Sequence, residues 1–324
     1  MIYAPVLIST VNRYQHFKDC IESLSRCTWA DKTDVFVAVD YPPSEKYWEG
    51  YHLIKKYLDS CGDLGFHSLN RIYRETNYFY SERGNLTSLR NEVFKTYDRC
   101  IVTEDDNIFS PNFLVYMNKG LELFKDDSTI LAINGYNNFY PFKKNKNTFM
   151  RQNVYFSAWG YGSWREKHYQ YVESISLPYL QKKFSMSTLW RLKKNGWDHV
   201  AYYLSEFSKD RIPHSDWEYN LIMSIEQFDV VSPVLSLVRN NGWDETGVNC
   251  SPLLYGEIAE KHMNQVISTE KDFIYKGSGK EYYEENREIY KSHTYSKVGI
   301  MTFVKILIKF IYHVIRILCQ RKKI

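Results

Sequence analysis

The sequence predicts an α/β fold built on a mainly parallel sheet with helices on both faces. Short apolar runs rich in Val and Ile alternate, over the first hundred residues, with longer stretches whose apolar residues recur at helical spacing. Alternating strands and helices are typical of parallel sheets covered on both sides. The 324 residues are 44% hydrophobic and 25% charged, which is enough to bury the core that such a sheet requires.

The predicted strands and helices follow one another from the N-terminus. They are a strand over 4–10, a helix over 13–27, a strand over 33–40, a helix over 45–61, a strand over 70–75, a helix over 85–97 and a strand over 100–104. Ligands of such sheets bind beyond the carboxyl ends of the strands, so polar residues after different strands are expected to meet at one edge. These residues are Thr10 to Arg13, Asp40, and the acids Glu104 to Asp106.

Three consecutive acids, Glu104, Asp105 and Asp106, stand at the end of the last of these strands. Carboxylates held together repel one another, and a bound cation or hydrogen-bond donors usually relieve the repulsion. Oxygen ligands of this kind suit Mg²⁺ or Mn²⁺ with a nucleotide diphosphate. The alternative is that the acids cap the following helix. No Walker-type or G-x-G-x-x-G motif is present to bind phosphates instead.

Charge and cysteine content argue against several classes of protein. The net charge of +4 is too small to indicate a nucleic-acid partner. Six cysteines without a C-x-x-C pair indicate neither a zinc site nor a disulfide framework. The N-terminus lacks a basic segment followed by a long apolar run, so no secretion signal is expected and the protein is predicted to be cytoplasmic. The aromatic content of 17% suits either core packing or stacking on sugar rings.

Five segments carry a resemblance to a known family. They are "PVLISTVNRYQHFKDCIESL", "VFVAVDYPP", "VTEDD" with the following "NIFSPNFLVYM", "VYFSAWGYGSWREKHYQ" and "HSDWEYNLIMSIEQFDVVSPVLSLVRNNGWDETGVN". In order and spacing they resemble N-acetylglucosaminyltransferase I and its relatives over roughly residues 3 to 250. The resemblance implies a GT-A fold and a metal-dependent, inverting transfer of a sugar from a UDP-sugar, with UDP-GlcNAc as the suggested donor.

The resemblance also implies roles for residues at the predicted edge. Asp106 corresponds to the ligand of Mn²⁺ or Mg²⁺, and Glu104 and Asp105 fall near the ribose and nucleotide. Arg13 matches the basic residue that lines the nucleotide site, and Asp40 matches the acid that faces the base. These positions are the same ones that the predicted strand ends bring together.

Asp216 corresponds to the catalytic base of the family. Inverting transfer is a one-step displacement, so it requires one carboxylate to accept the acceptor proton and a Lewis acid at the leaving diphosphate. Asp216 lies among aromatic residues, where burial would raise its pKa, and it also suits a helix N-cap. Asp244, in a glycine-bearing segment that suits a lid or a plain loop, is the second candidate. Arg83 matches a basic residue near the uracil or is a solvated residue before a helix.

The composition changes at the C-terminus. Residues 298–324 are mostly apolar apart from Lys305, Lys309, His313 and Arg316, which recur every three or four positions and form one stripe on a helix. Cations inside a membrane-spanning segment are costly, whereas a helix in the headgroup plane accommodates the stripe. The pattern therefore predicts attachment to an anionic membrane surface. The alternative is packing on the protein or on a second copy.

The sequence predicts three segments: a GT-A glycosyltransferase domain over 1–264, a linker and helical region over 265–297, and a basic amphipathic helix over 298–324. The expected activity is sugar transfer to a glycan or lipid-linked oligosaccharide in surface-polysaccharide synthesis, at the inner face of the cell membrane. Two alternatives stay open. They are a nucleotidyltransferase that releases pyrophosphate, and a non-catalytic glycan-binding or membrane scaffold protein.

Overall fold

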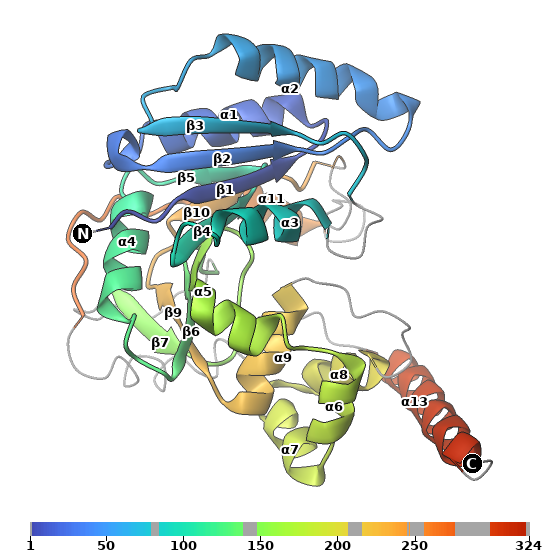
Figure 1. Ribbon diagram of the computed structural model, residues 1–324. Helices are drawn as coiled ribbons and strands as arrows, with labels where there is room; N and C mark the ends of the chain where they lie inside the picture. The colour runs from blue at the N-terminus through green and yellow to red at the C-terminus, as the bar shows by residue number, and fades with distance from the viewer. Residues whose placement is uncertain are drawn as a thin grey trace.

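The computed structural model describes residues 2–78, 84–138, 148–206, 216–244, 246, 256–275 and 299–321, without the side chains of residues 198, 258, 313 and 316–321. In this part of the chain, eight strands form one sheet in the order β3-β2-β1-β4-β8-β6-β9-β7 (Figure 1). They are β1 Val6–Thr10, β2 Asp34–Val39, β3 Ser68–Tyr73, β4 Arg99–Glu104, β6 Ile130–Asn134, β7 Phe149–Gln152, β8 Tyr161–Trp164 and β9 Asp229–Pro233.

Most strands of this sheet point the same way. β1 pairs in parallel with β2 and β4, β2 with β3, and β6 with β9. β8 is antiparallel to both β4 and β6, so those two strands share a direction, and β7 is antiparallel to β9. The carboxyl ends of β1, β2, β3, β4, β6 and β9 therefore lie along one edge. The predicted mainly parallel α/β sheet is confirmed.

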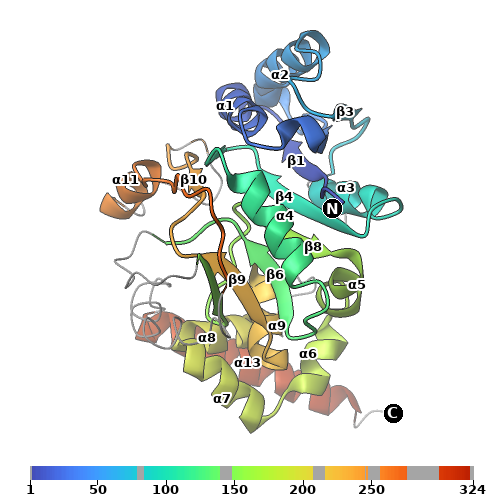
Figure 2. The same ribbon diagram turned by 90° about the vertical axis from the view of Figure 1, so that its left-hand side faces the viewer.

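Helices cover both faces of the sheet (Figure 2). The helices of the described residues are α1 Tyr14–Ser25, α2 Trp48–Ser60, α3 Gly84–Val93, α4 Phe113–Leu123, α5 Arg165–Lys167, α6 Leu177–Lys183, α7 Met186–Asn195, α8 Trp197–Glu206, α9 Asp216–Glu226, α11 Glu257–Met263 and α13 Ile300–Arg321. Short helical turns lie at Ala30–Lys32, Glu45–Tyr47 and His168–Val172.

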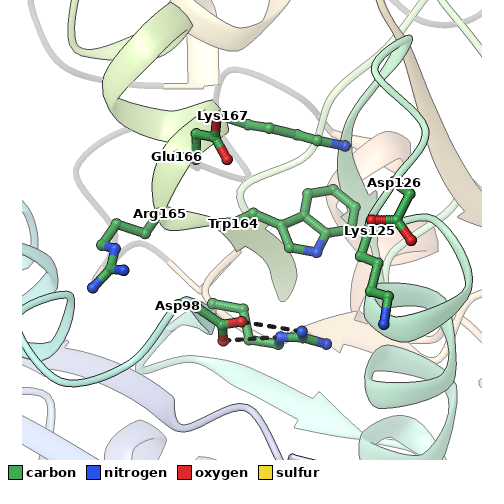
Figure 3. Close-up of a pocket in the computed structure, with 8 residues that line it drawn as sticks. Asp98, Lys125, Asp126, Trp164, Arg165, Glu166 and Lys167 are labelled. Atoms are coloured by element: carbon green, nitrogen blue, oxygen red, sulfur yellow. Dashed lines mark hydrogen bonds and ion pairs between the residues drawn. The ribbon is translucent and has the colours of Figure 1, made fainter.

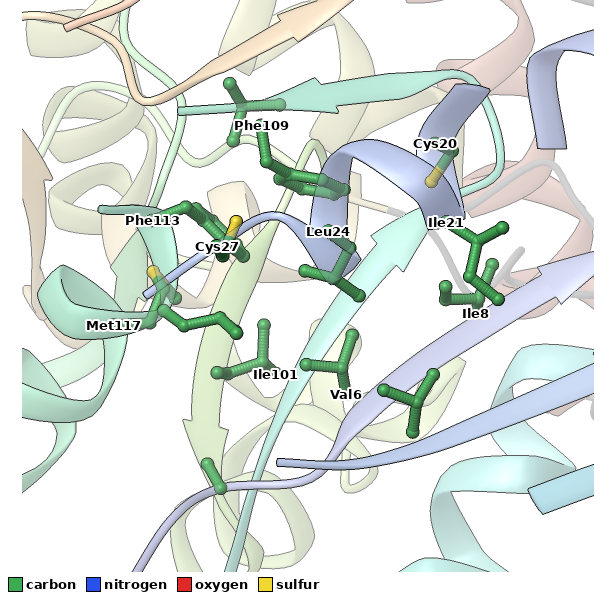
Figure 4. Packing of buried hydrophobic residues seen from close by; sticks show 14 of the residues in the cluster. Val6, Ile8, Cys20, Ile21, Leu24, Cys27, Ile101, Phe109, Phe113 and Met117 are labelled. Carbon is green, nitrogen blue, oxygen red and sulfur yellow. The ribbon is translucent and has the colours of Figure 1, made fainter. Parts of the chain in front are cut away.

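The two faces have separate apolar clusters because alternate strand residues point to opposite sides. Val6 and Ile8 of β1 pack in one cluster with α1, α2 and α4 (Figure 4). Leu7, between them, packs in the second cluster with α3 and with α6 to α9. Burial of apolar side chains on both faces explains why the strand sequences read as nearly continuous apolar runs.

A second, two-stranded sheet lies beside the main one. β5 Asn107–Phe109 directly follows the acids and pairs antiparallel with β10 Val238–Asn240. In this register Asn240 lies opposite Asn107. The pairing brings residues after β10 next to residues that precede them by more than a hundred positions.

The C-terminal helix α13 lies beside α8 (Figure 1). Phe303, Ile306 and Phe310 pack on the second apolar cluster, so one face of α13 rests on the protein. The alternative of packing on the protein is thus confirmed for that face. No helix among the described residues combines the length and apolar character of a transmembrane span. The predicted segment boundaries stay a prediction, and residues 276–298 lie outside the described residues.

A hollow of about 240 Å³ lies at the opposite edge of the sheet, near the start of β4 (Figure 3). Lys167 extends across Trp164 there, with Nζ 3.9 Å from the ring centre. The same ammonium donates to the carbonyl oxygens of Asp127 and Ile130, each at 2.8 Å, and burial lowers the pKa of Lys167 to about 8. This lysine joins segments of the chain, and the hollow lies away from the ligand-binding edge.

Candidate functional site

The turns after β1 and β4 meet because the two strands are neighbours. Ser9 lies beside Glu104 in the parallel register, so the residues that follow each strand approach one another. The turn after β1 also packs tightly on α2, since a Cβ atom at Gly50 would overlap the carbonyl oxygen of Asn12. This packing fixes the backbone just before Arg13.

Arg13 binds two of the three acids. Its Nη1 lies 2.8 Å from Oδ2 of Asp106, and its Nη2 pairs with Oδ1 of Asp105. Thr10 donates its hydroxyl to the other oxygen of Asp105 at 2.6 Å. Both aspartates are buried. Arg13 is therefore the built-in counter-charge of the acidic cluster.

The segment after β10 closes over Asp106. Asn240 donates from Nδ2 to Oδ1 of Asp106 at 2.7 Å, and the Asn241 amide donates to the Asp106 carbonyl oxygen at 2.9 Å. A Cβ atom at Gly242 would overlap Oδ2 of Asp106, so only glycine fits there. The sequence identified this segment as a lid or loop and missed the roles of Asn240 and Gly242. The short Asn-Asn-Gly run is the only local signal.

Burial opposes ionisation of the acid that this segment covers. It raises the pKa of Asp106, the Arg13 charge opposes that rise, and the nearby Asp105 charge adds to it. The neutralising contacts of Arg13 thus make a buried aspartate pair tolerable.

Glu104 and Asp216 form the second part of the acidic edge. Burial, followed by the negative charges of Asp106 and Asp216, raises the pKa of Glu104 to about 8. Asp216 is the first residue of α9, and burial raises its pKa although backbone amides there oppose the rise. The charge of Asp216 acts on Glu104, so the two carboxyl groups belong to one acidic edge with raised pKa values, which is typical of a site suited to proton transfer.

Asp40 lies at the same edge, after β2. Its Oδ1 accepts hydrogen bonds from the backbone amides of Tyr41, at 2.9 Å, and Tyr78, at 2.8 Å. Its own amide donates to the Thr10 carbonyl oxygen at 2.8 Å. In these contacts Asp40 fixes the backbone around the nucleotide position that the resemblance implied. Arg83, the other residue assigned there, lies outside the described residues.

Asp244 is placed differently from Asp216. Its side chain is exposed and pairs with His16 Nε2 at 2.9 Å. Burial tends to raise its pKa, but hydrogen bonds from Thr246 and the His16 charge outweigh this effect and lower it. A carboxylate whose pKa is lowered by such pairing is a weaker base than the half-buried Asp216, whose pKa is raised.

Aromatic side chains line the side of the site next to Gly242. Trp243 stacks on His262 of α11 with ring centres 4.5 Å apart, and Trp159 meets the His262 ring edge-on at 5.3 Å. Tyr136 bonds His262 Nδ1 through its hydroxyl at 3.0 Å. Burial lowers the pKa of His262 to about 4, so the ring is neutral near pH 7. The cluster holds the segment after β10 in place.

The acidic cluster suits a divalent cation by residue type, but Arg13 competes for the same oxygens. Among the described residues, no group of three or more His, Cys, Asp and Glu side chains is arranged to hold a metal ion. Each oxygen of Asp106 already accepts a hydrogen bond, one from Arg13 and one from Asn240. A cation bound to Asp106 would therefore compete with Arg13 or Asn240 for a carboxylate oxygen.

Several solved structures are similar to this chain at low identity, whereas no protein-family model and no curated protein matches it. S. aureus TarS 1-349 matches 96% of this chain and 81% of its own, at 10% identity and a TM-score of 0.42. The chain spans 49% of the longer TarS structure. The mannosyltransferase PcManGT from Pyrobaculum calidifontis, in complex with GDP-Man and Mn²⁺, matches 97% of this chain and 87% of its own, at 10% identity and a TM-score of 0.39. Mouse xyloside xylosyltransferase 1 matches 69% of this chain and 82% of its own, at 10% identity and a TM-score of 0.35. Similarity at this level assigns neither activity nor donor.

The raised pKa of Glu104 predicts a pH-dependent gain in stability for Glu104→Gln. Between its ordinary value of 4.5 and about 8, the folded protein binds this proton more tightly than the unfolded chain, so the free energy of unfolding falls as pH rises through that window. Thermal unfolding should show a higher melting temperature for the variant at pH 8, and the difference should vanish near pH 4.

Glu122→Gln is the matched control. Glu122 is partly exposed, and hydrogen bonds from Lys125 and Arg99 lower its pKa, so its loss should slightly destabilise the protein at pH 8. A melting temperature of Glu104→Gln at or below that of the wild type at pH 8 would show that the Glu104 charge is stabilised in the folded protein.

Competition between Arg13 and a cation for the same carboxylates predicts that Mn²⁺ restores stability lost in Arg13→Gln. Removing one partner of a buried ion pair should lower the free energy of unfolding by about 3 kcal/mol. MnCl₂ should then raise the melting temperature of the variant more than that of the wild type, because the bare carboxylates bind the ion.

Arg99→Gln serves as the control, since Arg99 also pairs with two carboxylates, Asp98 and Glu122, but at the opposite edge. Manganese should not rescue it. If MnCl₂ stabilised the wild type as much as Arg13→Gln, Arg13 would not compete with the ion.

Proposed function

We propose that this protein is a glycosyltransferase that moves a sugar from a UDP-sugar to a glycan or lipid-linked oligosaccharide, with inversion. UDP-GlcNAc is the first donor to test. The observation that carries the proposal is the pairing of two features at the carboxyl edge of the sheet. One is the acidic cluster bound by Arg13, and the other is the half-buried carboxyl of Asp216, whose charge raises the pKa of Glu104.

Asp216 is assigned as the base of this reaction. The acceptor hydroxyl gives its proton to an Asp216 oxygen while the acceptor oxygen bonds to the anomeric carbon. The bond from that carbon to the diphosphate oxygen breaks, and UDP leaves with the electron pair. A carboxylate whose pKa is raised by burial accepts a proton more readily than one of ordinary pKa. Asp244, exposed and paired with His16, remains the second candidate.

The acidic cluster is assigned to the donor. A bound Mn²⁺ or Mg²⁺ would neutralise charge on the departing diphosphate, and Asp106 is the side chain that would hold it. Arg13, once released from a carboxylate, is placed to pair with a diphosphate oxygen. Glu104 and Asp105 are assigned to the ribose and nucleotide, and Asp40 to the base.

We further propose that the enzyme acts in surface-polysaccharide synthesis, as a peripheral protein on the inner face of the cell membrane. The support for this is the outer side of α13, which exposes apolar residues together with Lys305 and Lys309. A basic amphipathic helix of this kind binds in the headgroup plane of anionic membranes.

The assignment of the base predicts that Asp216→Asn keeps its affinity for UDP but transfers sugar about 10²-fold more slowly or worse, the usual scale for removing a general base. Calorimetry with UDP and Mn²⁺ measures the binding, and turnover of a UDP-sugar with acceptor measures the transfer. Asp244→Asn is the matched change on the exposed carboxylate. Loss of transfer in Asp244→Asn with normal rates in Asp216→Asn would reverse the two assignments.

The assignment of the donor site predicts that UDP is released from one member of a UDP-sugar panel, and that EDTA slows this release. Asp106→Ala should weaken UDP–Mn²⁺ binding by about tenfold or more, a loss of about 1.4 kcal/mol. Pyrophosphate released from UTP and a sugar 1-phosphate would instead indicate a nucleotidyltransferase. Glycan binding without either product would indicate a non-catalytic protein.

A further inference from the structure

Large apolar side chains are exposed together at the helical end of the molecule. Met186 and Trp190 of α7 are 79% and 60% exposed, and Trp197 at the start of α8 is 57% exposed. The outer side of α13 exposes a second group, namely Ile300, Met301, Val304, Leu307, Ile308, Ile311, Tyr312 and Ile315. Contiguous apolar surface of this kind marks an interaction site.

Ring contacts place the two groups on neighbouring helices. The ring of Trp197 lies 5.6 Å from that of Phe303 of α13, and Phe184, just before α7, lies 5.4 Å from Phe310. Trp197 and Phe184, the two rings that contact α13, each keep more than a third of their surface exposed. These contacts place α13 next to the exposed residues of α7 and α8, and the exposed residues of the three helices are here called the Trp face.

The charge on α7 and α13 has one sign. Lys193 Nζ lies 4.8 Å from the ring centre of Trp190 and 5.0 Å from that of Trp197, so one ammonium sits over both rings. Lys194, Lys305 and Lys309 are exposed nearby on α7 and α13. Neither α7 nor α13 contains an Asp or Glu. A second copy docking face to face would bring lysine against lysine, which disfavours self-association.

We propose that the Trp face docks on an anionic lipid bilayer, with Trp190 and Trp197 inserted at the headgroup level beside α13. Indole rings favour that depth, and lysine stems extend along apolar surface while their ammonium groups reach lipid phosphates. This inference rests on the proposed membrane attachment of α13. It adds a second contact from a part of the chain more than a hundred residues earlier.

The packing behind the Trp face sets the height of the proposed active site. α13 packs on α8, and Tyr202 of α8 stacks on Trp217 of α9 with ring centres 3.6 Å apart. Asp216 directly precedes Trp217. Because α7 and α8 belong to the Trp face and both pack on α9, one helix-packing distance of about 8 to 10 Å separates the helix that carries the base from the docked helices. The sugar of a membrane acceptor would therefore meet the base close to the headgroups.

Vesicle flotation of the full chain tests the inference. The vesicles are phosphatidylcholine and phosphatidylglycerol in equal parts, with pure phosphatidylcholine for comparison. The wild type should float with the anionic vesicles, less so at high salt. The double variant Trp190→Ala and Trp197→Ala should bind about tenfold more weakly or worse, since both indoles lose their apolar burial. Leu53→Ala with Leu123→Ala, which removes exposed apolar residues of α2 and α4, should float like the wild type.

A second readout follows the two indoles directly. Addition of anionic vesicles should shift tryptophan emission to shorter wavelength, and Trp190→Phe with Trp197→Phe should bind almost normally while losing most of the shift. A wild type that stays at the bottom overturns docking. Normal flotation of the double Ala variant overturns the role of the indoles, and membrane attachment would then depend on α13 alone. A dimer in solution that the double Ala variant abolishes assigns the face to a second copy.

Failure of the proposed function would look different. The vesicle readouts do not depend on catalysis, and release of UDP with a soluble acceptor analogue does not depend on vesicles. Protein that floats but releases no UDP contradicts sugar transfer only, and protein that releases UDP but does not float contradicts docking only.

Discussion

The ion pairs from Arg13 to Asp105 and Asp106 join the turn after β1 to the end of β4. Without a counter-charge, two buried adjacent carboxylates would take up protons or open to water. With it, Asn240 and Gly242 can close directly over Asp106, and β10 can pair with β5 beside the main sheet. The shape of this edge thus depends on one guanidinium group.

The same edge retains unfavourable electrostatic interactions that Arg13 relieves only in part. Glu104 holds its proton to about pH 8 because of burial and its acidic neighbours, and Asp216 is shifted in the same direction. Such groups lower the stability of a fold at neutral pH. A loss of stability of this kind is typical of catalytic sites, where a shifted pKa is needed for the reaction.

The two ends of the molecule carry side chains of different kinds. The carboxyl edge of the sheet gathers buried acids and one arginine, whereas α7, α8 and α13 present exposed indoles, aliphatic residues and lysines. The helices α8 and α9 connect them, because α8 packs on α13 and also stacks against the first turn of α9. A membrane-bound acceptor and a soluble donor would then approach the proposed base from different sides.

Local patterns determined much of this protein. Alternating apolar runs gave the order of strands and helices, strand ends located Thr10, Arg13, Asp40 and the acids, and the spacing of lysines gave the amphipathic helix. Such signals lie within a few neighbouring residues, so they can be read without the fold. Only the tertiary structure paired Arg13 with an aspartate 93 positions away and Asn240 with one 134 positions away. It also half-buried Asp216 while leaving Asp244 and the indoles of Trp190 and Trp197 exposed, because burial depends on which distant elements pack together.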